Sequence, residues 1–245
     1  MQSNKKQVDF LIKLHKKKYR DQHQKFFIEN PKVLWEEYSN SLLDSIYVTD
    51  NFYQANEDCK ILKAVYRISE KDLKKISNQV NPLGMVALFN MPEPKQFIFK
   101  SKNVLILDNI SDPGNMGTII RTADWFGFKH LFLGDNCVEV FNPKVVAASM
   151  GSIFNISINQ EAHLESLIKD LKKEKYKIVV TDLMGDEFDI DKKDKIALVI
   201  GNETKGVDKK LIKIADKRFK IMKSGKAESL NAAVAAGIVM NKIKF

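Results

Sequence analysis

The sequence predicts an α/β protein of two domains, the second of which is built on a buried parallel sheet. Short apolar runs alternate with longer stretches of helical periodicity along the whole chain. In the second half the runs are apolar without interruption, as in strands that are covered on both faces. A proline-containing stretch at residues 91–102 separates the two halves. We therefore predict one domain at residues 1–90, a linker at 91–102 and a second domain at 103–245.

The first domain is predicted to be a small α/β unit. Its apolar runs predict strands at residues 26–28, 45–48, 64–68 and 84–89. Helical periodicity predicts helices at 8–19, 31–41 and 70–76, and Ser69 is placed to cap the last of them.

The second domain is predicted to carry stronger strands, at residues 104–107, 130–133, 177–181 and 196–200. Helices separate them. The helix expected at 162–173 has apolar residues at the spacing of one packed face, so its leucines belong to the core.

Composition excludes several classes of protein. The 245 residues are 44% hydrophobic and 29% charged, which is typical of a globular chain and not of a disordered one. No apolar run approaches the roughly 20 residues of a membrane span, and no secretory signal is readable, so we expect a cytoplasmic protein. Cys59 and Cys137 lie far apart and the four histidines are scattered, which predicts free thiols and no metal site.

The charge of the chain favours an acidic partner. The net charge is +9, and residues 1–30 hold eight Lys and Arg against three Asp and Glu. The cations cluster at Lys13, Lys16, Lys17, Lys18 and Arg20, a density that suits contacts with nucleic-acid phosphates. The alternative is an ordinary solvated helix face in a lysine-rich protein.

A first functional segment runs from residue 107 to 127. A strand ends, Asp112, Pro113 and Gly114 suggest a tight turn, and a helix begins near Asn115. Ligands bind at the carboxyl ends of parallel strands, so Asn115 and Arg121 are candidate site residues. Because an unpaired guanidinium is costly to bury, Arg121 needs an anion or a partner. The alternative is a structural arginine paired with a neighbouring carboxylate.

Two later segments also follow strands. In residues 198–208, Gly201 and Gly206 flank Asn202 and Glu203, so the loop can present its backbone to a ligand; an ordinary strand-to-helix turn is the alternative. Residues 219–240 form a short strand, a glycine loop and an alanine-rich helix that Ser229 is placed to cap. The small side chains of this helix suit close packing, either inside the molecule or against a partner subunit, although a cap without further role is the alternative.

The three segments, in this order, resemble the three motifs of the SpoU (TrmH) family of RNA 2'-O-ribose methyltransferases: DPGNMGTIIRTADWFG, LVIGNETKGV and IMKSGKAESLNAAVAAGI. The resemblance implies an α/β-knot fold, a homodimer, S-adenosylmethionine as cofactor and a structured RNA as substrate. Residues 1–90 resemble, by pattern, the L30e-like substrate-binding domain of some family members. No glycine fingerprint of a P-loop or dinucleotide-binding unit occurs.

The resemblance also implies roles for individual residues. Arg121 would activate the ribose hydroxyl or stabilise its developing charge, and Asn115 would orient the target. Further site positions are Glu203, Ser229 and Asn231, and the positions expected to contact the cofactor are Gly201, Ile221, Leu230 and Thr181. The RNA-binding positions are Lys16, Lys17, Lys18 and Arg20. The sequence departs from the family at Met222 and Lys223, where proline and methionine are usual, at Thr204, which replaces a glycine, and at Asn30, which also replaces a glycine.

The substrate implied first is ribosomal RNA of the large subunit, 23S rRNA. Three alternatives stay open: methylation of tRNA, a knotted RNA-binding protein without catalysis, and a nucleotide-dependent enzyme of plain doubly wound fold.

Overall fold

The chain groups into two compact units. The computed structural model describes residues 1–60, 62, 64–93, 97, 99, 101–161, 163–187 and 193–244. One unit comprises Met1–Glu93 and Glu139–Gly151, and the other Pro94–Val138 and Ser152–Phe245. We predicted residues 139–151 within the second domain, whereas the structure groups them with the first unit. Residues 94–96, 98 and 100 of the predicted linker lie outside the described residues.

The first unit is built on a mixed sheet of four strands. β4 (Met85–Asn90) lies between β1 (Lys25–Ile28) and β2 (Leu43–Val48) and is antiparallel to both. β3 (Val65–Arg67) is parallel to β2 at the other edge. All four strands were predicted, with ends that differ by one or two residues. The helices of this unit are α1 (Lys5–Lys13), α2 (Lys17–His23), α3 (Pro31–Glu37), α4 (Asp50–Ala55), η1 (Glu57–Lys60), α5 (Glu70–Ile76) and α7 (Pro143–Ser149).

The helix predicted at residues 8–19 is two helices, α1 and α2. At the break, the Arg20 guanidinium donates to the backbone carbonyls of Leu14 and His15 at 2.7 and 2.9 Å. The last carbonyls of a helix have no intrahelical partner, so these bonds satisfy groups that the end of α1 leaves open. Two caps in this unit are clear: Ser69 Oγ accepts from the Asp72 N–H at 3.1 Å, as predicted, and Asn30 caps α3.

The second unit is built on six strands that are all parallel, which confirms the predicted sheet. Their order is β10-β8-β9-β5-β6-β7. The strands are β5 (Asn103–Leu107), β6 (His130–Leu133), β7 (Ser157–Gln160), β8 (Tyr176–Asp186), β9 (Lys195–Ile200) and β10 (Lys217–Phe219). β7 was not predicted, because its residues are polar and only half-buried.

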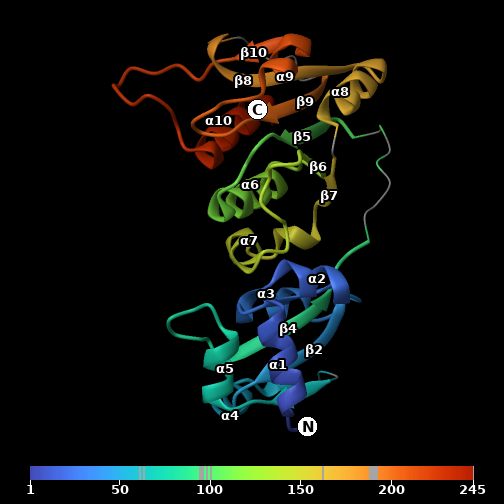
Figure 1. Cartoon of the computed structure of the whole chain (residues 1–245), viewed down its shortest axis with the longest axis vertical. Helices are drawn as coiled ribbons and strands as arrows, with labels where there is room; N and C mark the ends of the chain where they lie inside the picture. The colour runs from blue at the N-terminus through green and yellow to red at the C-terminus, as the bar shows by residue number, and fades with distance from the viewer. Residues whose placement is uncertain are drawn as a thin grey trace. The chain divides into compact units, whose positions relative to one another are not determined.

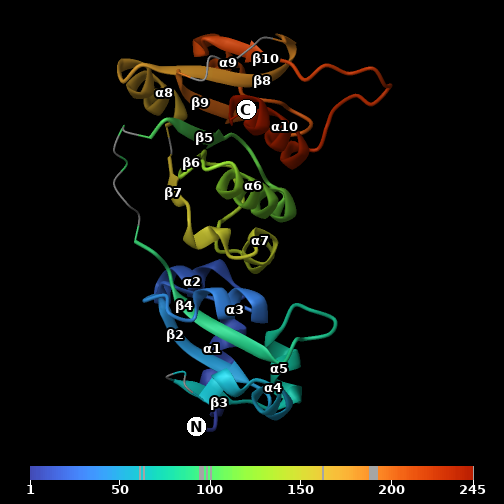
Figure 2. The same ribbon diagram turned by 180° about the vertical axis from the view of Figure 1, so that it is seen from behind.

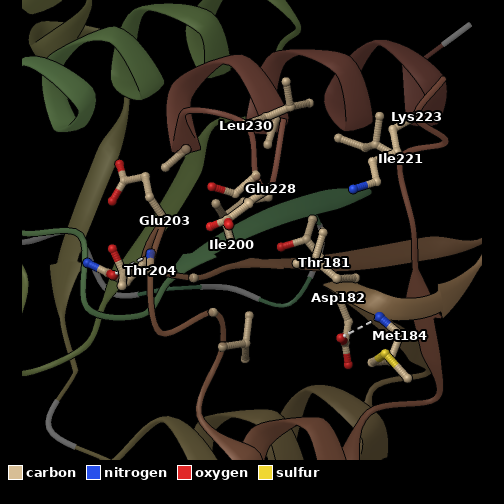
Figure 3. A pocket seen from close by; sticks show the side chains of 18 of the residues that line it. Thr181, Asp182, Met184, Ile200, Glu203, Thr204, Ile221, Lys223, Glu228 and Leu230 are labelled. Carbon is tan, nitrogen blue, oxygen red and sulfur yellow. Dashed lines mark hydrogen bonds between the residues drawn. The ribbon is translucent and has the colours of Figure 1, made fainter. Parts of the chain in front are cut away.

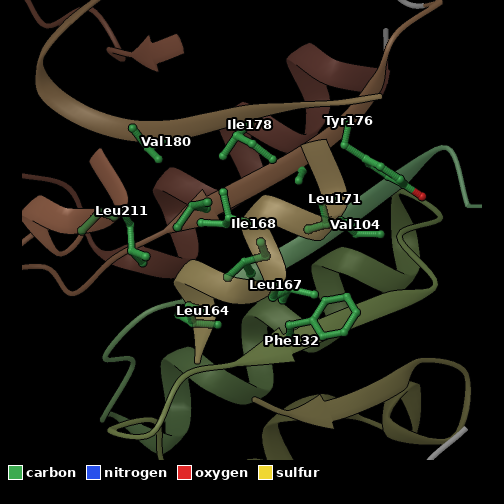
Figure 4. Close-up of a cluster of buried hydrophobic side chains, with 14 residues drawn as sticks. Val104, Phe132, Leu164, Leu167, Ile168, Leu171, Tyr176, Ile178, Val180 and Leu211 are labelled. Carbon is green, nitrogen blue, oxygen red and sulfur yellow. The ribbon is translucent and has the colours of Figure 1, made fainter. Parts of the chain in front are cut away.

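Helices cover both faces of this sheet (Figures 1 and 2). On one face, α8 (Leu164–Lys173) and α9 (Lys209–Ile214) bury a cluster that includes Val104, Ile178 and Val199 from three neighbouring strands (Figure 4). On the other, α10 (Ala232–Lys244) packs against α6 (Pro113–Trp125) and β9. Ala162, where we predicted α8 to begin, lies outside the described residues. The unit thus has three layers, as expected for a parallel sheet.

The carboxyl ends of the parallel strands gather at one edge of the sheet, which is where α/β proteins bind ligands. The connection from β10 to α10 is long, and residues 222–231 are exposed throughout. Figures 1 and 2 show it running away from the unit and returning to α10. Among the described residues, no helix has the length and apolar character needed to cross a membrane.

Candidate functional site

A cavity of about 660 Å³ lies at this edge of the second unit. Its walls come from the end of β8, the loop after β9 and the connection from β10 to α10 (Figure 3). A volume of this size suits a small organic ligand. The lining includes all four positions predicted to contact a cofactor, together with two predicted site residues: Thr181, Gly201, Ile221, Leu230, Glu203 and Ser229.

The loop after β9 is closed on itself by Asn202. The backbones of Asn202 and Gly206 exchange two hydrogen bonds, at 2.9 and 3.2 Å. The Asn202 side-chain oxygen also accepts from the backbone N–H groups of Thr204 and Lys205, at 2.9 and 3.1 Å. Sequence reasoning gave Asn202 no role, although a short amide next to a glycine is a signal for such a turn.

Glycine is required at both ends of this loop. A Cβ on Gly201 would lie 2.3 Å from the Gly206 carbonyl carbon, so no side chain fits there. Gly206 has a φ of +71°, which favours glycine, and the space where its Cβ would project is open. Gly206 therefore leaves its backbone open on that side, whereas the side-chain position of Gly201 is filled by the backbone of Gly206. That the loop presents its backbone to a ligand stays a prediction.

The turn after β5 holds the same loop from outside. The Asp108 N–H donates to the Ile200 carbonyl at 2.9 Å, and the Asp108 carboxylate accepts from the Asp208 N–H at 2.7 Å. The next residue, Asn109, accepts the Asn202 side-chain N–H on its carbonyl at 3.2 Å. Two consecutive residues thus fix the beginning, the middle and the end of the loop that forms one wall of the cavity.

Asp108 is a buried carboxyl, with 9% of its surface exposed. Burial raises its pKa above the ordinary value, because the charged form loses its hydration; the hydrogen bond from the Asp208 N–H acts in the opposite direction, and the Asp208 carboxylate adds to the rise. Burial also raises the pKa of the nearby Cys137 thiol, so Asp108 is, of the residues that the structure describes, one of two groups at this edge of the sheet whose titration the folded structure alters.

A chain of side-chain hydrogen bonds joins the three segments singled out in the sequence. The Asn115 amide N–H donates to the Glu203 carboxylate, and the Asn231 amide N–H donates to the Asn115 side-chain oxygen at 2.7 Å. Glu203 also lines the cavity. Three of the five predicted catalytic positions therefore meet, although they are separated by up to 116 residues.

Asn231, and not Ser229, caps α10. The Asn231 side-chain oxygen accepts from the backbone N–H groups of Ala233 and Val234, at 2.9 and 3.3 Å. The predicted cap at Ser229 is wrong because the helix begins at Ala232, three residues later. Since its oxygen faces the helix end, the Asn231 amide nitrogen is left to face Asn115. Ser229 lines the cavity instead.

Asp112 caps α6, with its carboxylate accepting from the Asn115 N–H at 2.7 Å. Pro113 and Gly114 are the first helical residues, so the tight turn predicted there is wrong. Proline suits this position because the first helical N–H has no partner in any case. The cap fixes the helix start, and with it the place of Asn115.

Arg121 is exposed and lies about 9 Å along the α6 axis from Asn115, by the rise per residue of an α-helix. It shares one stripe of the helix with Thr118 and Trp125, and Trp125 is 85% exposed. Among the described residues Arg121 has no ion pair and no side-chain hydrogen bond. The alternative of a structural arginine paired with a carboxylate is therefore wrong, and the guanidinium faces solvent.

The cations predicted to bind RNA in the first unit divide into two kinds. Lys16, Lys17 and Lys18 are exposed, and Lys17 pairs with Asp21 one turn away. Arg20 is only 2% exposed; its guanidinium pairs with Glu139 and bonds two backbone carbonyls. A buried and fully engaged guanidinium is closed to phosphates, so the prediction for Arg20 is wrong.

Cys59 is buried and Cys137 half-buried, both as free thiols. Across the described residues, no group of three or more His, Cys, Asp or Glu side chains is arranged to hold a metal ion.

A parallel α/β sheet with a cavity at the carboxyl ends of its strands is typical of a ligand-binding α/β domain. Comparison with known proteins gives the family. Residues 102–241 match the SpoU rRNA methylase family, and residues 5–87 match the MRM3-like substrate binding domain. The chain belongs to the SpoU rRNA methylase family, as the sequence motifs predicted.

Two of the relatives described here match nearly the whole chain, and a third matches 72% of it. The 23S rRNA (guanosine(2553)-2'-O)-methyltransferase RlmP of Bacillus subtilis is 34% identical over 235 residues, which cover 95% of this chain and 93% of that protein. The crystal structure of an AdoMet-bound rRNA methyltransferase from Sinorhizobium meliloti is 28% identical, with a TM-score of 0.82 over 99% of this chain and 96% of that one. The mouse mitochondrial rRNA methyltransferase 3 is 27% identical over 72% of this chain and 56% of its own length.

Proposed function

We propose that this protein transfers a methyl group from S-adenosylmethionine to a ribose 2'-hydroxyl of structured RNA, with 23S rRNA as the substrate. The observation that carries the proposal is the meeting of Asn115, Glu203 and Asn231 beside a cavity that three loops line. Membership of the SpoU family supports the reaction, and the Bacillus relative supports the substrate.

The cavity fits S-adenosylmethionine in size and in the chemistry of its walls. Residues 201–207 of the loop after β9 line it, and at Gly206 no side chain stands between the backbone and open space. Ile200, Ile221 and Leu230 give it apolar walls. When bound, the cofactor supplies a methyl group on a sulfonium. The loop is already closed by Asn202, so little ordering entropy is spent on binding.

Arg121 and Asn115 are proposed to act on the RNA. A guanidinium stays protonated at neutral pH, so Arg121 is suited to hold a phosphate and to stabilise the charge that develops on the ribose oxygen. The Arg121 guanidinium is available for these contacts, because it forms no ion pair with a carboxylate of the described chain. Asn115 is held by Glu203 and Asn231, which fixes its orientation toward the target ribose.

The domains are proposed to divide the work. Residues 1–90 would bind the RNA substrate, and Lys16, Lys17 and Lys18 would contact its phosphates. Residues 91–102 would link the two domains, and residues 103–245 would catalyse the methyl transfer. The match to a substrate-binding domain supports the first assignment. Cytoplasmic residence follows from the proposed action on bacterial ribosomal RNA.

We also propose a trefoil knot and a homodimer. Support for the knot comes from the topology. The chain leaves β10, which is an edge strand, and returns to pack α10 against α6 and against β9, an inner strand of the sheet. Support for the dimer comes from Trp125, Val234 and Ile238, which are 85%, 51% and 43% exposed on α6 and α10. Exposed apolar side chains on neighbouring helices suit a subunit interface. Sedimentation that gave a monomer mass would contradict the dimer.

The first test is methyl transfer by the purified protein from labelled S-adenosylmethionine to 23S rRNA fragments and to tRNA. We expect label on a ribose of the rRNA. Arg121→Ala and Arg121→Lys should lower turnover by about 100-fold or more, while cofactor binding is kept, because a lysine ammonium cannot form the planar contact of a guanidinium.

Three results would contradict this proposal. Label in tRNA alone would refute the substrate. Absence of cofactor binding by the wild-type protein would favour a non-catalytic RNA-binding protein. Near-normal turnover of Arg121→Lys at every pH would remove the role of Arg121.

A further inference from the structure

The strongest concentration of positive charge lies in the second unit, beside the cavity. Residues 205–226 contain nine Lys and Arg and only two carboxylates, so this stretch carries seven of the nine net charges of the chain. It exceeds the amino-terminal cluster of residues 1–30, whose net charge is +5. A local excess of this size creates a strong positive potential over the surface.

Most of these charges are not neutralised by neighbouring carboxylates. Lys205, Lys209, Lys213 and Lys226 are exposed, and within the described chain none of them forms an ion pair. Arg218 and Lys210 differ, because Arg218 pairs with Asp182 at 2.8 Å and Lys210 with Glu165 at 3.9 Å. Lysines without intramolecular partners can bind anions, because no existing ion pair has to be broken first.

The unpaired lysines lie on three elements that border the cavity: the loop after β9, helix α9, whose Ile212 lines the cavity, and the connection from β10 to α10. Lys209 and Lys213 are four residues apart on α9 and therefore share one face of that helix. Lys226 is on the long connection from β10 to α10, where its neighbours Gly225 and Ala227 line the cavity. Lys205 and Lys223 line the cavity itself. Figures 1 and 2 show α9 beside β10, from which this connection starts.

We propose that Lys205, Lys209, Lys213 and Lys226 form a phosphate-binding surface on the catalytic unit, which holds the RNA strand next to the cofactor cavity. This inference rests on the proposed function and adds to it a second RNA contact, distinct from the amino-terminal lysines. A polyanionic strand fits because the four cations of this surface are exposed lysines that have no carboxylate partner within the described chain. Such groups bind phosphates without reading bases, so the surface gives affinity and position, and base identity is read elsewhere.

The test is a triple variant, Lys209→Gln, Lys213→Gln and Lys226→Gln, which leaves the cavity-lining Lys205 in place. RNA binding is measured at several salt concentrations, and S-adenosylmethionine binding by calorimetry. The slope of log K against log salt is negative, and each lost phosphate contact should make it shallower by about 0.7 to 0.9. The triple variant should therefore have a slope smaller in magnitude by about 2 to 3. We expect RNA affinity to fall at least about tenfold at low salt, with cofactor affinity unchanged.

The matched control is Lys102→Gln, Lys169→Gln and Lys175→Gln, which removes the same charge from exposed lysines of the same unit. Lys102 and Lys175 precede β5 and β8, at the sheet edge opposite the cavity. An unchanged slope in the triple variant at Lys209, Lys213 and Lys226 would overturn the proposal. An equal change of slope in the control would overturn it too. If the wild-type protein transfers methyl groups and either result is found, only this surface is refuted; if it transfers none, the proposed function fails first.

Discussion

Side-chain amides and one buried carboxyl set the geometry of this site. Asn231 caps α10 with its oxygen and meets Asn115 with its nitrogen, and Asn202 fills the loop after β9 in a similar way. Each uses both ends of the amide, which fixes its orientation. The sequence identified Asn115 from its place after a strand, but it gave Glu203 and Asn231 a site role only through the resemblance to a family. That the three residues meet could not be predicted, since residues 88 and 116 positions apart carry no local signal of contact. The burial of Arg20 could not be predicted, because a run of cations in the sequence does not show which of them is buried.

Asp108 gives a prediction for the pH dependence of stability. Its pKa is raised in the folded protein above the roughly 3.9 of an unfolded chain, so folding favours the protonated form. The stability that this group contributes is full below the unfolded pKa and is lost as the pH rises through the folded value. Asp108→Asn removes this titration and keeps an oxygen for the Asp208 N–H.

We therefore expect the melting temperature of Asp108→Asn, relative to wild type, to increase as the pH rises from about 4 toward neutrality. Thermal melts over this range measure the difference. A difference that stays constant, or that decreases with pH, would contradict the assigned environment of Asp108.

Strands and helices were predicted where packing dominates and missed where it does not. The apolar runs that became β5, β6, β8 and β9 are buried on both faces, so their pattern was sufficient. β7 has three polar residues among its four and lies at the sheet edge, and the split between α1 and α2 falls where Arg20 binds the Leu14 carbonyl. Helix starts at Pro113 and Ala232 were misplaced by one to three residues, because Asp, Asn and Ser all serve as caps.

The loop after β9 yields a prediction for cofactor binding. Asn202→Ala removes three side-chain hydrogen bonds, at about 0.5–1.5 kcal/mol each, and should weaken S-adenosylmethionine binding by about 10- to 100-fold. Asn202→Asp keeps the oxygen that accepts from Thr204 and Lys205 and should restore part of the affinity.

Calorimetry with S-adenosylmethionine measures this series. Asn136→Ala is the control, because Asn136 is an exposed asparagine on another loop and does not line the cavity. Equal affinities for wild type and Asn202→Ala would show that the loop does not depend on Asn202.

The whole chain combines a substrate-binding part with a catalytic part, and each part contains a cluster of positive charge. Sequence analysis located the two parts and the amino-terminal cations, but not the denser cluster at residues 205–226, which is spread over a loop, a short helix and an edge strand. A count of charge along the chain would have found it. Its position beside the cavity is a property of the fold, since β9 and β10 end at the same edge of the sheet.

We propose that the loops at the carboxyl ends of the strands direct a methyl group to an RNA ribose. The most direct test is to map ribose methylation in RNA from cells with and without the gene. The account predicts one 2'-O-methylated position in 23S rRNA that disappears without the gene and returns with the wild-type protein but not with Arg121→Ala. Identical maps in the two strains, or a loss confined to tRNA, would contradict it.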